Sequence, residues 1–219
     1  MTLEEYKKQM EQKEDWAPGW DAIDSCFAKL YPGQEPRHYA TDLVHRAIFG
    51  GEEFLDGVSI YQSENGYKHI VTYGMSALYA DEKDFGNDYS RWGYEMTIKL
   101  PVETDEECIW AISLLSNMAR YTYTQQRFFE PYQGVPGSGV SIKQGVDSKL
   151  TGLLVVEDTE IQGIDTVHGR LEFMQFIGIT NEEVEEMKKG YESIVKLLDK
   201  MKEDNPMLIT DINRNKSCV

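Results

Sequence analysis

The four histidines are the residues from which a catalytic or metal centre would first be built. His38, His45, His69 and His168 stand far apart in the sequence, and none lies in an HxH or HExxH arrangement. Imidazoles that follow one another at such short spacings are the usual local pattern of a metal site. The spacing therefore predicts no metal centre, because lone histidines are more often hydrogen-bonded or surface groups.

Glu95 is a carboxylate that interrupts an otherwise apolar strand pattern. Because side chains alternate along a strand, Glu95 points opposite to Tyr94 and Met96, and the plainest expectation is a solvent-facing position. The functional interpretation is a carboxylate that grips a partner on a sheet face. A further alternative stays open, in which His38, His69 and Glu95 converge in the fold and form a metal-dependent hydrolase.

A glycine-rich segment, Gly134 to Ser141, comes close to the spacing of a phosphate-binding loop. Val140 stands where the lysine that meets the phosphates is required, and no helix pattern follows to offer its N-terminus. We therefore expect a flexible connection here rather than a nucleotide site. The wider region 130–149 holds several Gly and Pro among polar residues and is predicted to be a long loop.

Acidity is the strongest compositional feature of the chain. Among 219 residues, 38 Asp and Glu oppose 22 Lys and Arg, which gives a formal charge of −16 and an isoelectric point near 4.6. Neutralising phosphates requires a basic face, so direct binding of nucleic acid is disfavoured, and so is binding to an anionic membrane. The plainest interpretation of such a charge is solubility, but clustered carboxylates also speed the encounter with a basic protein partner.

Four of these carboxylates fall in one segment, Ala80 to Asp88, which has no apolar period and is predicted to be an exposed loop. It follows a hairpin rich in tyrosine, and tyrosines with one wet end are common interface residues. Together these features predict a surface that binds a basic protein. Its candidate residues are Tyr61, Tyr73, Tyr79, Asp81, Glu82, Asp84, Asp88 and Glu95.

The elements that must position these residues follow from the periodicity. Asn65-Gly66, between two alternating segments, is the strongest hairpin signal in the chain. Three of the predicted helices start at capping-box spacings and the fourth starts at Pro18. Predicted strands are 57–61, 68–73, 92–100, 153–156 and 171–177, and predicted helices are 2–13, 18–30, 104–123 and 180–201, which indicates an α+β fold. In the helix 104–123 the predicted buried face is Ile109, Ile112, Leu115 and Met118, packed on the strand 92–100.

The chain shows no internal repeat and no linker clean enough to divide it. We predict an N-terminal helical extension over 1–16, a single domain over 17–205 and a C-terminal tail over 206–219. No run of about 18 apolar residues occurs, and the first residues are polar, so neither a membrane-spanning helix nor a secretory signal is expected. The expected location is the cytoplasm.

Several short segments, taken in order, resemble the Suppressor of fused family in its shorter bacterial form. The resemblance is good over about residues 17–125 and loose beyond them. It implies an α+β fold with a mixed, largely antiparallel sheet flanked by helices, and it implies no cofactor and no catalytic residue. The segments are Pro18–Ile23 (PGWDAI), Leu30–Tyr39 (LYPGQEPRHY), Asp56–Tyr61 (DGVSIY), Thr72–Tyr79 (TYGMSALY), Trp92–Leu100 (WGYEMTIKL) and Ala119–Tyr121 (ARY).

The chain departs from the family pattern at Met75, Ala77 and Tyr94, where Leu, Glu and Phe are usual. Ala77 removes a carboxylate, so a family contact at that position is in doubt here. Animal members sequester a transcription factor and use a further C-terminal domain, which we expect this chain to be too short to hold. Bacterial members resemble immunity proteins or antitoxins that neutralise toxins, often nucleases. The resemblance thus implies a non-catalytic domain that neutralises a toxin by direct binding, with an adaptor that sequesters another cytosolic partner as the alternative.

Overall fold

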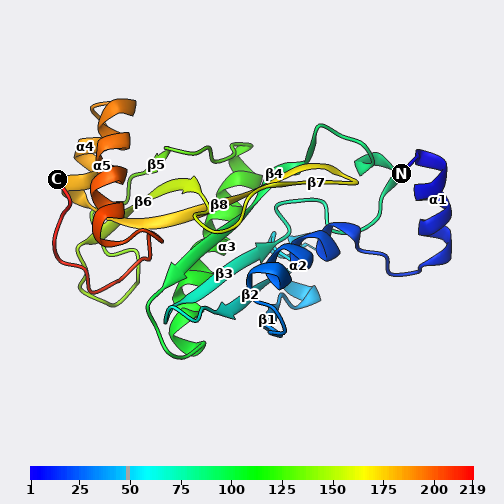
Figure 1. Cartoon of the computed structure of the whole chain (residues 1–219), viewed down its shortest axis with the longest axis horizontal. Coiled ribbons are helices and arrows are strands. Elements are labelled where there is room, and N and C mark those ends of the chain that lie inside the picture. Colours follow the sequence, from blue (N-terminus) through cyan, green and yellow to red (C-terminus); the bar gives the residue numbers. More distant parts are fainter. Residues whose placement is uncertain (48–49) are drawn as a thin grey trace.

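The computed structural model of the chain describes residues 1–47 and 50–219. Within these residues the strands form one sheet in the order β1-β2-β3-β4-β8-β6-β5, and β7 pairs with β8 outside this path (Figure 1). Neighbouring strands run antiparallel except β4 and β8, which are parallel, so the predicted α+β fold with a mixed, largely antiparallel sheet is confirmed. The strands are β1 Arg37–Ala40, β2 Gly57–Gln62, β3 Lys68–Tyr73, β4 Tyr89–Leu100, β5 Gly134–Val135, β6 Leu150–Glu157, β7 Ile164–Thr166 and β8 Gly169–Thr180.

The described part of the chain holds five α-helices, and their starts follow the sequence signals. The capping boxes at Thr2 and Thr180 are both complete, as predicted. The third, at Thr104, opens a 3₁₀ turn over Glu106–Cys108, from which the α-helix continues. The helices are α1 Leu3–Gln12, α2 Pro18–Leu30, α3 Ile109–Gln125, α4 Asn181–Met187 and α5 Tyr191–Asp204.

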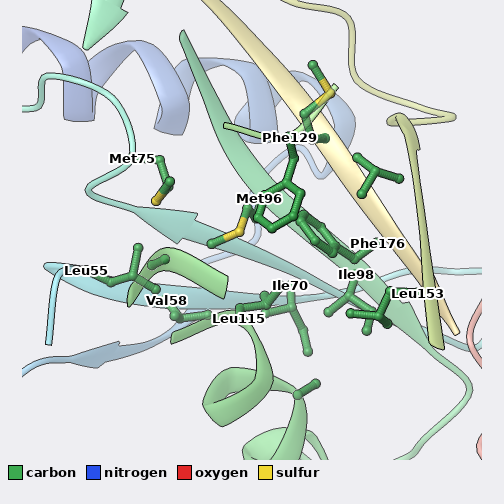
Figure 2. Packing of buried hydrophobic residues seen from close by; sticks show 14 of the residues in the cluster. Leu55, Val58, Ile70, Met75, Met96, Ile98, Leu115, Phe129, Leu153 and Phe176 are labelled. Carbon is green, nitrogen blue, oxygen red and sulfur yellow. The ribbon is translucent and has the colours of Figure 1, made fainter. Parts of the chain in front are cut away.

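Helices cover both faces of the sheet. On one face α3 packs through Leu115 in the same hydrophobic cluster as Met96 and Ile98, which confirms the predicted contact of this helix with β4 (Figure 2). The other face is covered by α2 at one end and by α4 and α5 at the other. These helices share a face because β8 contributes Phe173 to the cluster under α2 and Ile177 to the cluster under α4 and α5, and residues four apart in a strand point the same way.

The predicted helix 180–201 is interrupted. It forms α4 and α5, because the chain turns at Gly190, whose φ of 118° is rarely adopted by residues with a side chain. The apolar period continues across the turn because both helices cover the same cluster.

The buried stripe of α3 also differs from the prediction. It consists of Ala111, Leu115, Ala119 and Thr122, whereas Ile109 is 44% exposed. Small alanines let the helix lie close to the sheet, so the spacing of the large apolar side chains misplaced the buried face.

The short strands β1, β5 and β7 were not predicted, since two to four residues give no clear alternation. β5 lies within the predicted loop 130–149 and pairs with β6. In the glycine-rich segment that follows, Gly137 packs against the backbone of Thr151, whose carbonyl oxygen would lie 1.6 Å from a Cβ at this position. The segment is therefore a connection packed on β6.

The two segments predicted to flank the domain both contribute buried residues. Tyr6 in α1 and Leu208 near the C-terminus have no exposed surface. The division of the chain at residues 16 and 205 stays a prediction. Among the helices of the described residues, none combines the length and the apolar character that crossing a bilayer requires.

Candidate functional site

The structure places two of the candidate tyrosines in the interior. Tyr73 is fully buried, stacks on Trp20 with ring centroids 4.4 Å apart, and donates a hydrogen bond of 2.7 Å to Asp24 of α2. Tyr61 is 2% exposed and stacks on Phe27. The prediction that these two rings form a partner surface is therefore wrong, because α2 covers the face of the hairpin on which they lie.

Glu95 is fully buried, so neither the solvent-facing position nor the direct grip on a partner is correct. Its carboxylate accepts hydrogen bonds from the hydroxyls of Thr72 at 2.7 Å and Ser76 at 2.6 Å. It also accepts from the backbone N–H groups of Gly74, Met75 and Ser76, at 3.1, 3.3 and 2.9 Å. Burial raises the pKa of Glu95 to about 7, and the hydrogen bonds offset only part of that effect. Glu95 thus ties the segment after β3 to β4.

Tyr79 lies just beyond this tied segment and is accessible, with 49% of its surface exposed. Its hydroxyl donates to Asp56 at 3.2 Å, and Asp56 in turn pairs with Arg46. Around these groups is a cavity of about 310 Å³, to which Leu43 also contributes. Tyr79 therefore offers a ring beside a pocket, the arrangement that suits an interface anchor.

The acidic loop, residues 81–88, is exposed as predicted at Asp81, Glu82 and Asp88, while Asp84 is half-buried. Glu82 pairs with Lys7 at 2.6 Å, but both side chains are exposed and the pair contributes little to stability. Within residues 1–47 and 50–219, the other three carboxylates make no ion pair. Their charge is available to a partner.

Two side chains that are distant in sequence, His168 and Tyr6, fix the start of the acidic loop. His168 of the β7–β8 turn lies 2.8 Å from the carbonyl of Ala77 through Nδ1, so this nitrogen carries the proton and Nε2 is an acceptor. The Tyr6 hydroxyl lies 2.8 Å from Nε2 and donates to it, and it accepts a bond of 3.0 Å from the Asp81 N–H. The start of the loop is thereby fixed to α1 and to the sheet.

The three residues of the alternative hydrolase site each have separate partners. His38 bonds Ser59, and His69 bonds Tyr31 and Asp158. Glu95 bonds the segment after β3, as described above. No three His, Cys, Asp or Glu side chains of the described chain are grouped as metal ligands would be. The alternative in which His38, His69 and Glu95 converge on a metal is therefore wrong.

His69 instead belongs to a buried charged cluster that was not predicted. Lys99 has no exposed surface and pairs with Asp158 at 3.1 Å and with Glu160 at 2.8 Å. Asp158 also accepts from His69 at 2.9 Å and from the hydroxyl of Thr97. Burial by itself would raise the pKa of Asp158, but His69 and Lys99 hold that pKa well below its usual range.

The charged cluster lies inside the sheet. His69 pairs with Lys99 across β3 and β4, and Thr97 pairs with Gln175 across β4 and β8, so these four residues lie side by side on three neighbouring strands. They are enclosed, with no exposed surface, and no partner can reach them in this conformation. We assign them to the interior of the fold and not to the site. A sequence signal existed, since Thr97 and Lys99 alternate with the apolar residues of β4.

Comparison with known sequences gives a family match over most of the chain. The sequence model described as "Suppressor of fused protein (SUFU)" matches residues 51–215. The proteins named Suppressor of fused homolog from Homo sapiens and Mus musculus are each 29% identical over 217 aligned residues, which cover 91% of this chain. The matched region is 44% of each of those proteins, so the chain spans less than half the length of the curated relatives.

Comparison with solved structures gives the same fold. The chain in the crystal structure titled "the Sufu-Fu complex" has a TM-score of 0.78 at 26% identity, covering 92% of this chain and 93% of that one. Drosophila Suppressor of Fused matches with a TM-score of 0.78 at 26% identity, covering 92% and 51%. A SUFU homologue from Neisseria gonorrhoeae matches at 18% identity with a TM-score of 0.62, covering 92% and 97%, and at that identity it supports the fold alone.

Proposed function

The chain belongs to the Suppressor of fused family, and on this premise we propose that it is a non-catalytic protein-binding domain that neutralises a basic toxin by direct contact. Nucleases are the favoured class of toxin, because carboxylates can occupy the positions where the phosphates of their substrates would sit. The structural similarity to a chain of the Sufu-Fu complex supports the binding role. The proposed place of action is the cytoplasm.

The observation that carries this proposal is the acidic loop. Four carboxylates fall within residues 81–88, and within the described chain three of them make no ion pair. The start of the loop is held by Tyr6, which His168 positions, so the carboxylates near that anchor lose little conformational freedom on binding. A net charge of −16 adds long-range attraction for a basic protein.

Tyr79 completes the proposed surface, because it is exposed and lies two residues before the loop. Charges at a rim govern the rate of association, whereas a buried aromatic anchor governs the lifetime of a complex. We therefore assign steering to Asp81, Glu82, Asp84 and Asp88, and anchoring to Tyr79.

The test requires a basic toxin-like protein, which is sought first among the reading frames beside this gene. Its binding is measured by surface plasmon resonance at 50 and 300 mM salt, for the parent chain and for a loop variant carrying Asp81→Asn, Glu82→Gln, Asp84→Asn and Asp88→Asn. A control variant removes four charges at exposed positions elsewhere, with Glu35→Gln, Glu64→Gln, Glu203→Gln and Asp204→Asn.

We expect the loop variant to associate at least tenfold more slowly at 50 mM salt, and the control variant to stay within about twofold of the parent. Growth of cells that express the toxin should be restored by the parent chain and not by the loop variant. Equal slowing in both variants would remove the acidic loop from consideration. Binding to a non-toxic cytosolic protein, with no protection against the toxin, would favour the adaptor.

A further inference from the structure

A groove opens where β4 leaves β8. Tyr89 pairs with Arg170 and Tyr94 pairs with Glu172, so five steps along β4 match two steps along β8 and three residues bulge out of the ladder. Arg91 in this bulge has a φ of 56°, which marks a sharp local turn of the strand. Between the bulge and residues 128–131 lies a cavity of about 610 Å³.

Aromatic rings line this groove and continue beyond it. Tyr89 is 62% exposed and Phe128 is 54% exposed. Its neighbour Phe129 is buried instead, edge-to-face on Phe176 with ring centroids 5.2 Å apart (Figure 2). Exposed rings gathered in one place mark interaction sites more often than solitary ones.

A second pair of exposed rings adjoins the groove. Tyr132 and Tyr191 stand edge-to-face with centroids 5.2 Å apart. Tyr132 follows the groove residue Pro131, and its backbone bonds β6 at Val155. The aromatic face, by which we mean the groove with Phe128, Tyr132 and Tyr191, thus runs from β4 across β6 to the start of α5.

Carboxylates also line the aromatic face. Glu172 is held by Arg170 at 2.6 Å, but Glu130 and Glu157 make no ion pair within the described residues. The guanidinium of Arg91 stacks on the ring of Tyr123, 5.0 Å from its centroid. Arg91 also lines the groove, but Glu130 and Glu157 stand beside the exposed rings with no ion-pair partner among the described residues.

We infer that the aromatic face binds an extended, arginine-containing segment of a protein partner. A guanidinium can stack on Phe128 or Tyr132 while it donates two hydrogen bonds to Glu157 or Glu130. Lysine fits less well, because its ammonium is strongly hydrated and has no flat face to stack. The basic nature of the partner rests on the proposed function, but the residues differ from those of the acidic loop.

The probe is a fluorescein-labelled peptide, acetyl-Gly-Arg-Leu-Arg-Gly-amide, compared with peptides in which lysine or neutral citrulline replaces both arginines. Fluorescence anisotropy gives the affinities, and amide chemical shifts give the location. We expect the arginine peptide to bind at least tenfold more tightly than the citrulline peptide and severalfold more tightly than the lysine peptide. The largest shifts should fall at Phe128, Tyr132 and Glu157.

Two variants separate this site from general attraction to an acidic protein. Glu130→Gln with Glu157→Gln should weaken binding of the arginine peptide at least tenfold, whereas Glu203→Gln with Asp204→Asn, which removes the same charge at the end of α5, should change it less than twofold. Phe128→Ala should also weaken binding. Equal losses in the two charge variants, or shifts spread over the acidic loop instead, would overturn the inference.

The peptide experiment tests the aromatic face without a toxin. A chain that binds the arginine peptide at this face but no toxin would refute the proposed function and leave the site standing. A chain that binds the toxin through the acidic loop and shows no preference for arginine over citrulline would refute the site alone.

Discussion

Replacing Glu95 by glutamine should change how the stability of the protein depends on pH. The folded chain binds a proton at Glu95 with a pKa of about 7, whereas the unfolded chain releases it near 4.5. Between these values the folded state holds a proton that the unfolded state has lost, so the free energy of unfolding falls as pH rises. The glutamine side chain of the variant carries no such proton, and this part of the pH dependence should vanish.

The magnitude follows from the two pKa values. The interval from 4.5 to about 7, at about 1.4 kcal/mol for each pH unit, amounts to about 3 kcal/mol. The glutamine oxygen can still accept from Gly74 and Ser76, but its NH₂ group faces the Met75 N–H, which should cost about 1 kcal/mol at every pH. The pH-dependent change is therefore separable from the constant cost.

Urea unfolding followed by tryptophan fluorescence measures both effects. The isoelectric point near 4.6 favours precipitation at low pH, so the useful window is about pH 5.5 to 8.5. Across it the stability of Glu95→Gln relative to the parent should rise by about 2 kcal/mol, with most of the change below pH 7. A flat difference, or one that moves the other way, would mean that the five donors keep the carboxylate ionised, and it would refute the reasoning.

Three further predictions concern buried charges and the backbone. Glu183→Gln should change the pH dependence in the opposite sense. Burial alone would raise the pKa of Glu183, but Arg214 holds that pKa below its ordinary value. The variant should therefore lose about 1–3 kcal/mol of stability at pH 7, and this loss should shrink as pH falls below 4.5 in scans run at low protein concentration. Lys99→Met should lower the free energy of unfolding by about 3–5 kcal/mol in urea, because two buried carboxylates lose their cation. Adding Asp158→Asn should restore part of this stability, whereas additive losses in the double variant would contradict the pairing. Gly190→Ala should lower thermal stability by about 1 kcal/mol or more, because φ there is 118°, and an unchanged melting temperature would show that the turn adapts.

Short-range patterns in the sequence predicted most of the helices and strands. Thr2 and Thr180 cap helices because the donors and acceptors of a capping box lie within three residues of each other. Asn65-Gly66 closes the β2–β3 hairpin because Gly66 takes a positive φ of 79°. The family and the fold class were also predicted correctly, since the matching segments follow one another along the chain.

The candidate site was predicted correctly only where the exposure of a residue does not depend on a distant part of the chain. The acidic loop has no apolar residue periodicity, so it stays on the surface, as its sequence indicates. Tyr61 and Tyr73 were misplaced, because alternation shows that they share a face of the hairpin but not that α2 covers that face. Which side of a strand is buried depends on a helix elsewhere in the chain.

The sequence by itself determined where helices and strands begin, which family the chain belongs to and where its charge is concentrated. Only the tertiary structure decided which polar groups are enclosed: Glu95 with the segment after β3, and Lys99 with Asp158, 59 residues away. The physical reason is one of range. Caps and turns are satisfied by near neighbours, whereas a charge in the interior is stable only when the folded chain brings its partners to it.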